Sequence, residues 1–251
     1  MRRSILICLL PLVLAACGSS AHESAAPPAT TTAAPAPTCA PGYRSLVSPA
    51  RAQAAIVRSH ATAYRRPGGA ALADFGKVNV NDYPTVFGIL GKLVRADCGV
   101  TWLKAELPIK PNGITGWIRA EDVDVATVRT RILVDVSDRR VTLYRSGRPL
   151  LSSRAAVGAS ATPTPLGRYY VNQRLVPADP SGPYGPGAIG ISAFSDVLTG
   201  WAQGGPVAIH GTNEPWLIGQ AVSNGCIRVP NEMLRKFFRL AIAGTPVEIR
   251  A

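Results

Sequence analysis

Residues 41–127 alternate apolar and polar side chains over short stretches, with glycine, proline and asparagine between them. Alternation of this kind predicts strands with one buried face, and Pro111-Asn112-Gly113 predicts a turn. The expected strands lie at 55–64, 77–80, 85–90, 93–96, 101–107 and 115–119. Several short strands at this spacing predict a small β-barrel, in which we expect His60 to be structural rather than a ligand.

Residues 128–251 also alternate, and they add one segment with helical spacing. Strands are expected at 132–136, 141–144, 155–158, 167–175, 206–210 and 247–249, with a hairpin turn at Ser146-Gly147. A helix is expected to begin at Pro230-Asn231-Glu232 and to end at Gly244. The apolar residues that recur there every three or four positions are Met233, Leu234, Phe237, Phe238 and Ala241. The fold class is therefore mainly β, a small barrel followed by a strand-rich domain with one clear C-terminal helix.

The first sixteen residues have the pattern of an export signal. Arg2 and Arg3 form a basic start, and the apolar run at 5–16 is too short to span a membrane as a stable helix. The run leads into LAACG, which resembles a bacterial lipobox, where Cys17 carries the lipid and the chain is cut before it. Two acyl chains on Cys17 would anchor the protein stably at the outer face of the cell membrane. An ordinary secretory signal, cut near Ala16, is the alternative.

These features divide the chain into four segments. A signal peptide occupies 1–16, and the lipidated cysteine with an Ala/Pro/Thr-rich linker occupies 17–40, a composition that cannot bury a core. The small barrel occupies 41–127 and the strand-rich domain 128–251. The sequence GWIR at 116–119 resembles the bacterial Src-homology-3-like domains of cell-envelope proteins, which implies a binding or spacer module.

The formal charge is +12, and residues 128–251 hold 14 basic and 7 acidic side chains. A basic surface suits nucleic acid, an anionic envelope or a substrate that bears carboxylates. The export signal argues against nucleic acid, and free use of arginine by a GC-rich genome is an alternative without function. With only three histidines in the chain, a multi-histidine metal site is not expected. No metal is expected.

The cysteines indicate an oxidising compartment. Of five, Cys8 is lost with the signal and Cys17 is taken by lipid, which leaves three. Cys39 opens the first folded region and Cys98 lies near its end, so we expect them to form a disulfide, with two unpaired thiols as the alternative. Cys226 is then the free thiol.

Cys226 and His210 are the candidate catalytic groups. Gly225, just before the cysteine, lets the backbone turn tightly and bring main-chain amides beside the sulfur, where they can hold an oxyanion. His210 is the only histidine of residues 128–251 and lies sixteen positions before Cys226. The pair predicts a Cys–His dyad, in which the histidine is expected to raise the thiolate fraction of the cysteine.

The sequences AIHGT at 208–212 and SNGCIR at 223–228, with TPTPLG at 162–167, resemble the L,D-transpeptidase catalytic domain, the YkuD-like family. The resemblance covers about 120 residues, nearly all of the last domain. It implies that Cys226 is acylated by a peptidoglycan stem peptide, that D-alanine is released, and that the amine of a neighbouring stem completes a 3→3 cross-link. It also implies that carbapenem β-lactams inhibit the enzyme. If water accepts the acyl group, the activity is that of an L,D-carboxypeptidase.

The resemblance also assigns roles around the dyad. The main-chain carbonyl of Gly211 holds the imidazole tautomer, and the main-chain amides around Asn224, Gly225 and Cys226 form the oxyanion hole. Many family members have His where this chain has Asn224, which puts any side-chain role at 224 in doubt. Arg228 either braces the site or binds a substrate carboxylate, and a salt bridge inside the fold is the alternative. Substrate binding is assigned to Arg228, Ser223 and Thr212.

Other hydrolase and transferase classes lack their motifs. The chain has no Ser-x-x-Lys, no His-Glu-x-x-His and no Gly-x-Ser-x-Gly, which argues against a serine D,D-transpeptidase, a zinc peptidase and a serine hydrolase. A wall-binding lipoprotein without activity is the remaining alternative, and the presence of both His210 and Cys226 argues against it.

Overall fold

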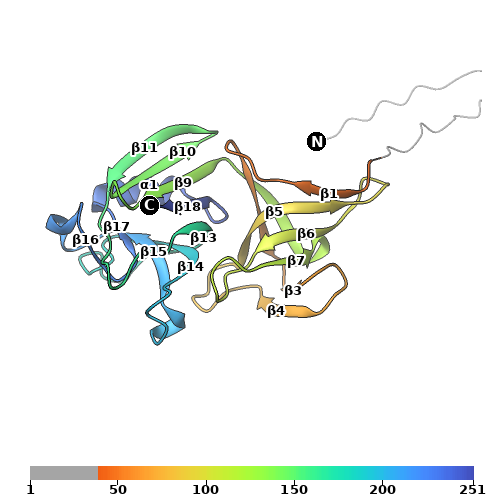
Figure 1. Cartoon of the computed structure of the whole chain (residues 1–251), viewed down its shortest axis with the longest axis horizontal. Coiled ribbons are helices and arrows are strands. Elements are labelled where there is room, and N and C mark those ends of the chain that lie inside the picture. Colours follow the sequence, from red (N-terminus) through yellow and green to blue (C-terminus); the bar gives the residue numbers. More distant parts are fainter. Residues whose placement is uncertain (1–38) are drawn as a thin grey trace, which may run out of the picture. The chain divides into compact units, whose positions relative to one another are not determined.

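The structure, a computed structural model, describes residues 39–251 (Figure 1). The described chain is mainly β and contains a single α-helix. No helix within it is long and apolar enough to cross a membrane. The predicted signal peptide and the lipidation of Cys17 lie outside the described residues.

The first part of the described chain forms one antiparallel sheet in the order β4-β3-β7-β6-β5-β2-β8, with β1 paired to β5. Strands β2 and β3 follow each other along the chain but pair with different neighbours, so the sheet turns a corner between them. A short 3₁₀ turn, η1 (Ala120–Asp122), precedes the last strand. The strands are β1 Gly42–Ser45, β2 Ala52–Val57, β3 His60–Tyr64, β4 Ala71–Gly76, β5 Val86–Val94, β6 Val100–Glu106, β7 Thr115–Arg119 and β8 Val123–Val128.

Small and large apolar side chains alternate inward to build the core of this sheet. Phe87, Leu103 and Ile118 are buried there among alanines such as Ala55 and Ala105. Small side chains let the strands curl closely around the larger ones, because protein interiors are close-packed. The core of this sheet is therefore built from a few large side chains and many alanines.

The strand predictions for this part were correct at 101–107 and 115–119 and wrong elsewhere in detail. The runs at 85–90 and 93–96 form one continuous strand, β5. The run at 77–80 is not a strand, and Val78 makes only an isolated bridge to Pro84. Residues 55–64 divide into β2 and β3, because the chain turns at Arg58 and Ser59. Strands β1, β4 and β8 were not predicted.

The second part forms a mixed sheet in the order β11-β10-β9-β18-β13-β14-β15-β17. Strands β9 and β18 run parallel, as do β15 and β17, and the other neighbours are antiparallel. Strands β12 (Val157–Gly158) and β16 (Ala221–Ser223) form a separate parallel pair. The remaining elements are β9 Thr130–Asp135, β10 Arg140–Arg145, β11 Arg148–Arg154, β13 Gly167–Leu175, β14 Ala188–Phe194, η2 Ala202–Gly204, β15 Pro206–His210, η3 Pro215–Leu217, β17 Ile227–Arg228, α1 Asn231–Leu240 and β18 Pro246–Arg250.

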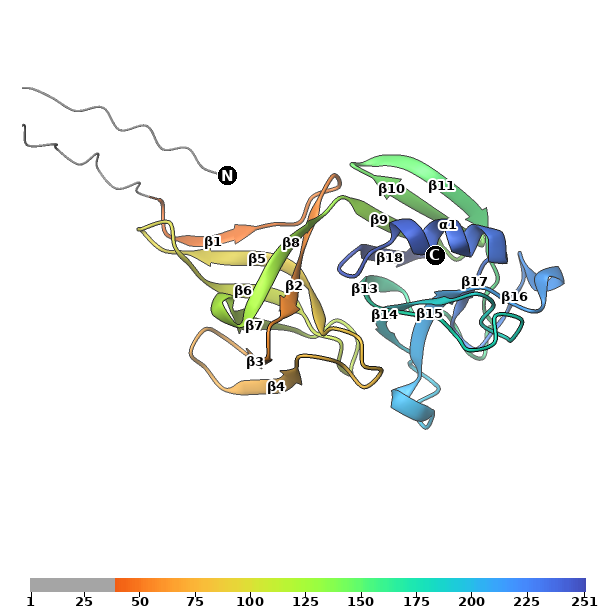
Figure 2. The same ribbon diagram turned by 180° about the vertical axis from the view of Figure 1, so that it is seen from behind.

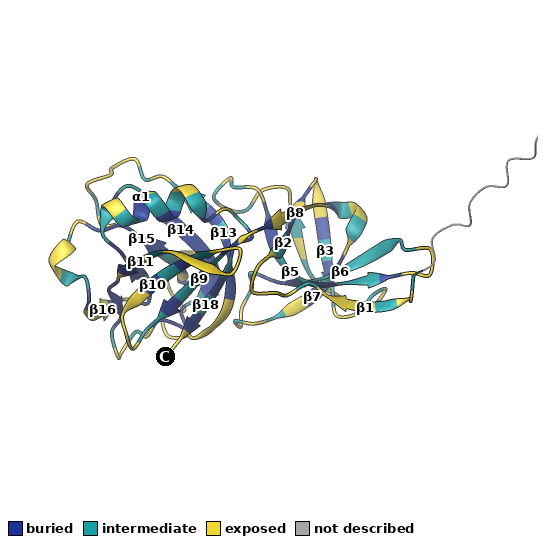
Figure 3. Cartoon of the chain, turned by 90° about the horizontal axis from the view of Figure 1, so that it is seen from above, coloured by how far each residue is buried: buried dark blue, intermediate teal, exposed yellow. Residues whose placement is uncertain are grey.

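Helix α1 packs on this second sheet (Figure 2) through Leu234 and Phe237, which are both buried. Buried positions are concentrated on the strands of the sheet and on one side of α1 (Figure 3). The helix ends at Leu240 rather than at the predicted Gly244, because the backbone of the buried Ala241 is already extended. The predicted hairpin turn is present, with positive φ at both Ser146 and Gly147.

Polar contacts connect the two sheets. The Ser192 hydroxyl on β14 donates to the Glu106 carboxylate on β6 over 2.6 Å. The Asn112 side chain pairs with the main chain of Phe194, donating over 2.8 Å and accepting over 2.9 Å. Strand β14, which pairs with the histidine-bearing β15, is therefore tied directly to the first sheet.

Candidate active site

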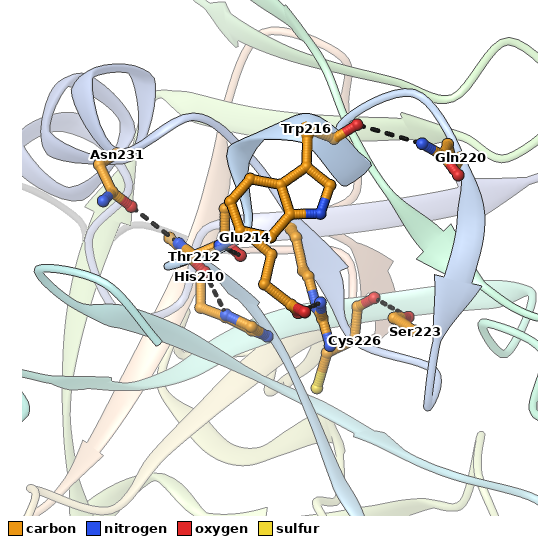
Figure 4. Close-up of polar contacts among 10 residues, drawn as sticks. His210, Thr212, Glu214, Trp216, Gln220, Ser223, Cys226 and Asn231 are labelled. Atoms are coloured by element: carbon orange, nitrogen blue, oxygen red, sulfur yellow. Dashed lines mark hydrogen bonds and ion pairs between the residues drawn. The ribbon is translucent and has the colours of Figure 1, made fainter. Parts of the chain in front are cut away.

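His210 and Cys226 come together because their strands are parallel neighbours at the edge of the second sheet. His210 ends β15 and pairs with Arg228 on β17, and Ile209 pairs with Ile227. Cys226 immediately precedes β17, so its side chain lies beside β15 (Figure 4). A sequence separation of sixteen residues is thus bridged by one strand pairing.

The His210 ring is buried, and its orientation is fixed by the main chain. Its Nδ1 lies 2.6 Å from the carbonyl oxygen of Gly211. A carbonyl can only accept a hydrogen bond, so Nδ1 carries the proton and Nε2 is the free basic nitrogen. The Tyr184 ring packs against the imidazole at a centroid distance of 4.9 Å. The predicted contact between the Gly211 carbonyl and the imidazole is therefore present.

Burial sets the charge state of His210. Removal from water lowers the pKa of His210 to about 4, against the opposing effect of the hydrogen bond to Gly211, and the positive charge of Arg228 lowers it further. The imidazole is therefore neutral at neutral pH. A neutral imidazole with a free Nε2 is ready to accept a proton.

Cys226 is a free, partly exposed thiol. Burial raises the pKa of Cys226, and a backbone hydrogen bond from Ala208 and the charge of Arg228 oppose this rise only in part. In the described chain the sulfur makes no hydrogen bond to His210. The expectation that His210 enriches the thiolate is therefore wrong for the resting site, because both partners are desolvated and remain neutral.

Gly225 shapes the turn that leads into Cys226. Its φ is +107°, in the region that favours glycine. Its amide, however, donates to the Ser223 hydroxyl over 3.2 Å and is already engaged. The amides of Asn224 and Cys226 flank it in the chain and remain the candidates for the predicted oxyanion hole.

Ser223 and Thr212 use their hydroxyls inside the fold. Both are buried, at 1% and 2% exposure. The Ser223 hydroxyl donates to the carbonyl oxygen of Cys226, and the Thr212 hydroxyl accepts from the amide of Glu214 over 2.9 Å. Their hydroxyls therefore hold the two loops that carry His210 and Cys226, and substrate binding by Ser223 and Thr212 stays a prediction.

Asn231, the first residue of α1, was not singled out from the sequence. Its Oδ1 accepts from the Thr212 amide over 2.7 Å and so holds the loop that follows His210. A Cβ on Gly211 would lie 2.2 Å from this oxygen, so only glycine fits there. The helix start is thus connected to the catalytic loop through a contact nineteen residues apart in the sequence.

Arg228 makes the salt bridge that the sequence left as an alternative. Its Nη1 lies 2.7 Å from Oε2 of Glu214, a residue of the loop between β15 and β16. Trp216, on the same loop, is 68% exposed.

The remaining candidates lie elsewhere. Cys39 and Cys98 form a disulfide beside the first sheet. His60 is exposed on β3, with its Nε2 3.5 Å from a carboxylate oxygen of Asp74. Across residues 39–251 no group of three or more His, Cys, Asp or Glu side chains is placed to hold a metal ion.

Known proteins are similar to the part of the chain that carries His210 and Cys226. A family model of the L,D-transpeptidase catalytic domain matches residues 129–249. The chain is 34% identical over 126 residues to YkuD of Bacillus subtilis, whose name assigns it to the L,D-transpeptidases, over 50% of this chain and 69% of that protein. A YkuD from Bacillus licheniformis is 35% identical over 123 residues, which cover 49% of this chain and 67% of that protein.

Solved structures with local similarity include an Enterococcus faecium L,D-transpeptidase, at 26% identity and a TM-score of 0.36, over 48% of this chain and 49% of that one. Another is L,D-transpeptidase 3 from Mycobacterium tuberculosis in complex with a faropenem-derived adduct, at 16% identity and a TM-score of 0.39. The match covers 55% of this chain and 73% of that one. The chain thus spans about half of the Enterococcus protein.

Proposed function

Because this chain belongs to the family of L,D-transpeptidase catalytic domains, we propose that it is a cysteine-dependent peptidoglycan L,D-transpeptidase with Cys226 as nucleophile and His210 as general base. One observation carries the proposal. A neutral imidazole, held in one tautomer by the Gly211 carbonyl, ends the strand that lies beside the thiol of Cys226. This arrangement fits the thiol–imidazole chemistry of acyl transfer.

The first half of the reaction acylates the enzyme. Nε2 of His210 takes the thiol proton as the sulfur of Cys226 bonds to the carbonyl carbon of the third, L-centred residue of a stem peptide. The amides of Asn224 and Cys226 stabilise the resulting oxyanion. When the C–N bond breaks, the imidazolium returns its proton to the departing amine of D-alanine, which leaves a thioester on Cys226.

The second half of the reaction decides the product. The side-chain amine of a neighbouring stem attacks the thioester, His210 accepts its proton, and the thiolate of Cys226 leaves to be reprotonated. The product is a 3→3 cross-link. If water attacks instead, the product is a shortened stem and the enzyme is an L,D-carboxypeptidase. No cofactor takes part in either route.

Mass analysis of muropeptides after incubation with the purified protein tests this proposal. A product joined through two third residues, with release of D-alanine, supports cross-linking. Shortened stems alone identify the carboxypeptidase. Binding to peptidoglycan without a change in muropeptide mass would identify a wall-binding protein without activity and defeat the proposed function.

The wider architecture is also part of the proposal. Cys17 carries a lipid that anchors the protein outside the cell membrane, and the first sheet is a Src-homology-3-like module that binds or spaces the catalytic domain from the membrane. The lipobox-like sequence LAACG supports the anchor. Changing Cys17→Ser should move the protein from the membrane fraction to the soluble fraction. Equal membrane partitioning of variant and wild type would defeat this assignment.

A further inference from the structure

Arg228 is a charged residue at the dyad: it pairs with His210 in the sheet, across β15 and β17, and follows Cys226 by two positions. Its positive charge lowers the pKa of both His210 and Cys226. Only 20% of its side chain is exposed. Its charge therefore acts on both groups of the dyad from a neighbouring strand position.

The hydrogen-bonding capacity of Arg228 is only partly used. A guanidinium offers five N–H donors in a fork that matches a carboxylate through two parallel bonds. Here Nη1 bonds to Glu214 over 2.7 Å, whereas Nε is buried and has no hydrogen-bond partner among the described residues. The guanidinium therefore keeps hydrogen-bonding capacity that Glu214 does not use.

Glu214 is held more loosely than its partner. Its side chain is 41% exposed, it lies on a loop rather than on a strand, and the carboxylate has no other partner within residues 39–251. Its amide is fixed to Thr212, so the side chain can swing away while the backbone stays in place. Ion pairs with this exposure are weak, so displacement of Glu214 by another carboxylate costs little.

We propose that Glu214 is a specificity-determining residue, whose carboxylate occupies in the free enzyme the place on Arg228 that a carboxylate of the substrate takes. This proposal rests on the proposed function, in which the departing D-amino acid carries such a carboxylate beside the bond that breaks. Glu214 then competes with the substrate and keeps Arg228 neutralised until a carboxylate-bearing donor arrives. Substrates without that carboxylate gain nothing from Arg228.

Two alkylating probes test the proposal without substrate turnover. Iodoacetate carries a carboxylate and iodoacetamide does not, while both lose iodide when the sulfur of Cys226 attacks their methylene carbon. Glu214→Gln should raise the ratio of the iodoacetate rate to the iodoacetamide rate about three- to tenfold, because a partly exposed ion pair no longer competes. Arg228→Gln should lower the ratio below that of wild type. The ratio cancels changes in thiol reactivity common to both reagents.

Glu232→Gln is the matched control. Glu232 is also a glutamate in an ion pair, with Lys236 at 2.8 Å, but it lies on the exposed side of α1. Its ratio should equal that of wild type. A Glu214→Gln ratio that stays at the wild-type value, or falls, would overturn the proposal and leave Glu214 as a brace for Arg228.

A substrate pair connects the probe result to the reaction. The purified full chain is given stem tetrapeptides that end in D-alanine or in D-alaninamide, and release of each product is followed. Glu214→Gln should lower KM for the free acid and leave KM for the amide unchanged. An equal change for both substrates would contradict the proposal. If the wild type releases neither product, the proposed function fails, while the alkylation ratio still decides the role of Glu214.

Discussion

The first sheet buries two polar or charged side chains among its described residues, Thr85 and Glu106, whereas residues 129–251 bury ten. Three of those ten are His210, Thr212 and Ser223, which hold or form the site. Burying a polar group is costly unless it is hydrogen-bonded, so polar residues accumulate inside a domain where they have a task. In the second region that task is to fix two loops around a thiol and an imidazole.

The cysteines differ in the same way. The first sheet uses its cysteines as a disulfide, and the second keeps a single free thiol in the described chain. A cross-link stabilises mainly by restricting the unfolded chain, so it suits a region with a small alanine-rich core. A reactive thiol must stay reduced and accessible. We infer that the disulfide-bonded first region contributes stability, whereas the second region, with its free thiol, carries the chemistry.

Loss of the dyad should have the largest effect. Cys226→Ala should abolish both D-alanine release and the covalent carbapenem adduct, and His210→Ala should slow both by roughly 10²–10⁴-fold, the usual contribution of a positioned acid–base group. His60→Ala, the matched histidine of the first sheet, should change neither. Intact-mass and peptide-mass spectrometry follow the adduct. An adduct on another residue would refute the mechanism.

The disulfide should matter to stability alone. Replacing Cys39 and Cys98 by Ser opens a loop of 59 residues and should destabilise the first region by up to about 4 kcal/mol. Hydrogen exchange should accelerate in β1, β5 and β6, while the alkylation rate of Cys226 stays at the wild-type value. Alkylation of denatured, unreduced wild type should label Cys226 and neither of the other two. A matching loss of Cys226 reactivity would break the division between the regions.

Glu106 gives the first region a pH dependence. Burial raises the pKa of Glu106 from 4.5 to about 7, against the opposing hydrogen bond from Ser192. Between pH 4.5 and 7 the folded protein keeps a proton on Glu106 that the unfolded chain releases. The free energy of unfolding is therefore highest below pH 4.5 and falls as the pH rises through this range. The loss should be at most about 3 kcal/mol.

Urea unfolding at pH 5 and pH 8 measures this loss, and Glu106→Gln should remove it. Glu121→Gln, an exposed glutamate of the same region, should leave it in place. Comparing each variant with wild type at each pH cancels the contribution of His210, whose lowered pKa costs stability as pH falls. An equal pH response in wild type and Glu106→Gln would contradict the assignment.

Local patterns predicted what depends on neighbouring residues. Strands β7, β13 and β15 were predicted within one residue of their observed bounds because alternation and turn residues mark their ends. Strand β14 was missed because both of its faces are buried, which removes the alternation. The run at 77–80 alternates without a partner strand beside it, and pairing is a property of the whole sheet.

The same limit applies to the site. His210, Cys226 and Gly211 could be named from sequence motifs, whereas the contact of Asn231 with Thr212 and the pairing of Glu214 with Arg228 depend on how loops fold back. The thiolate expectation failed for a related reason. Sequence gives the partners of a titratable group but not its burial, and here burial is the first cause of both pKa shifts.

The smallest effect should come from Asn224→Ala. Its proposed contribution is a main-chain amide, which the substitution keeps, so D-alanine release should fall by less than about threefold, far below the loss from His210→Ala. Asn112 is an asparagine of the first region that acts through its side chain, which makes two hydrogen bonds to the main chain of Phe194. Asn112→Ala should therefore lower the free energy of unfolding by about 1–3 kcal/mol without slowing D-alanine release, because it leaves the main-chain groups of Phe194 unpaired. If Asn224→Ala slowed D-alanine release as much as loss of His210, the side chain at 224 would have to touch the reacting atoms, and the oxyanion hole could not consist of backbone amides alone.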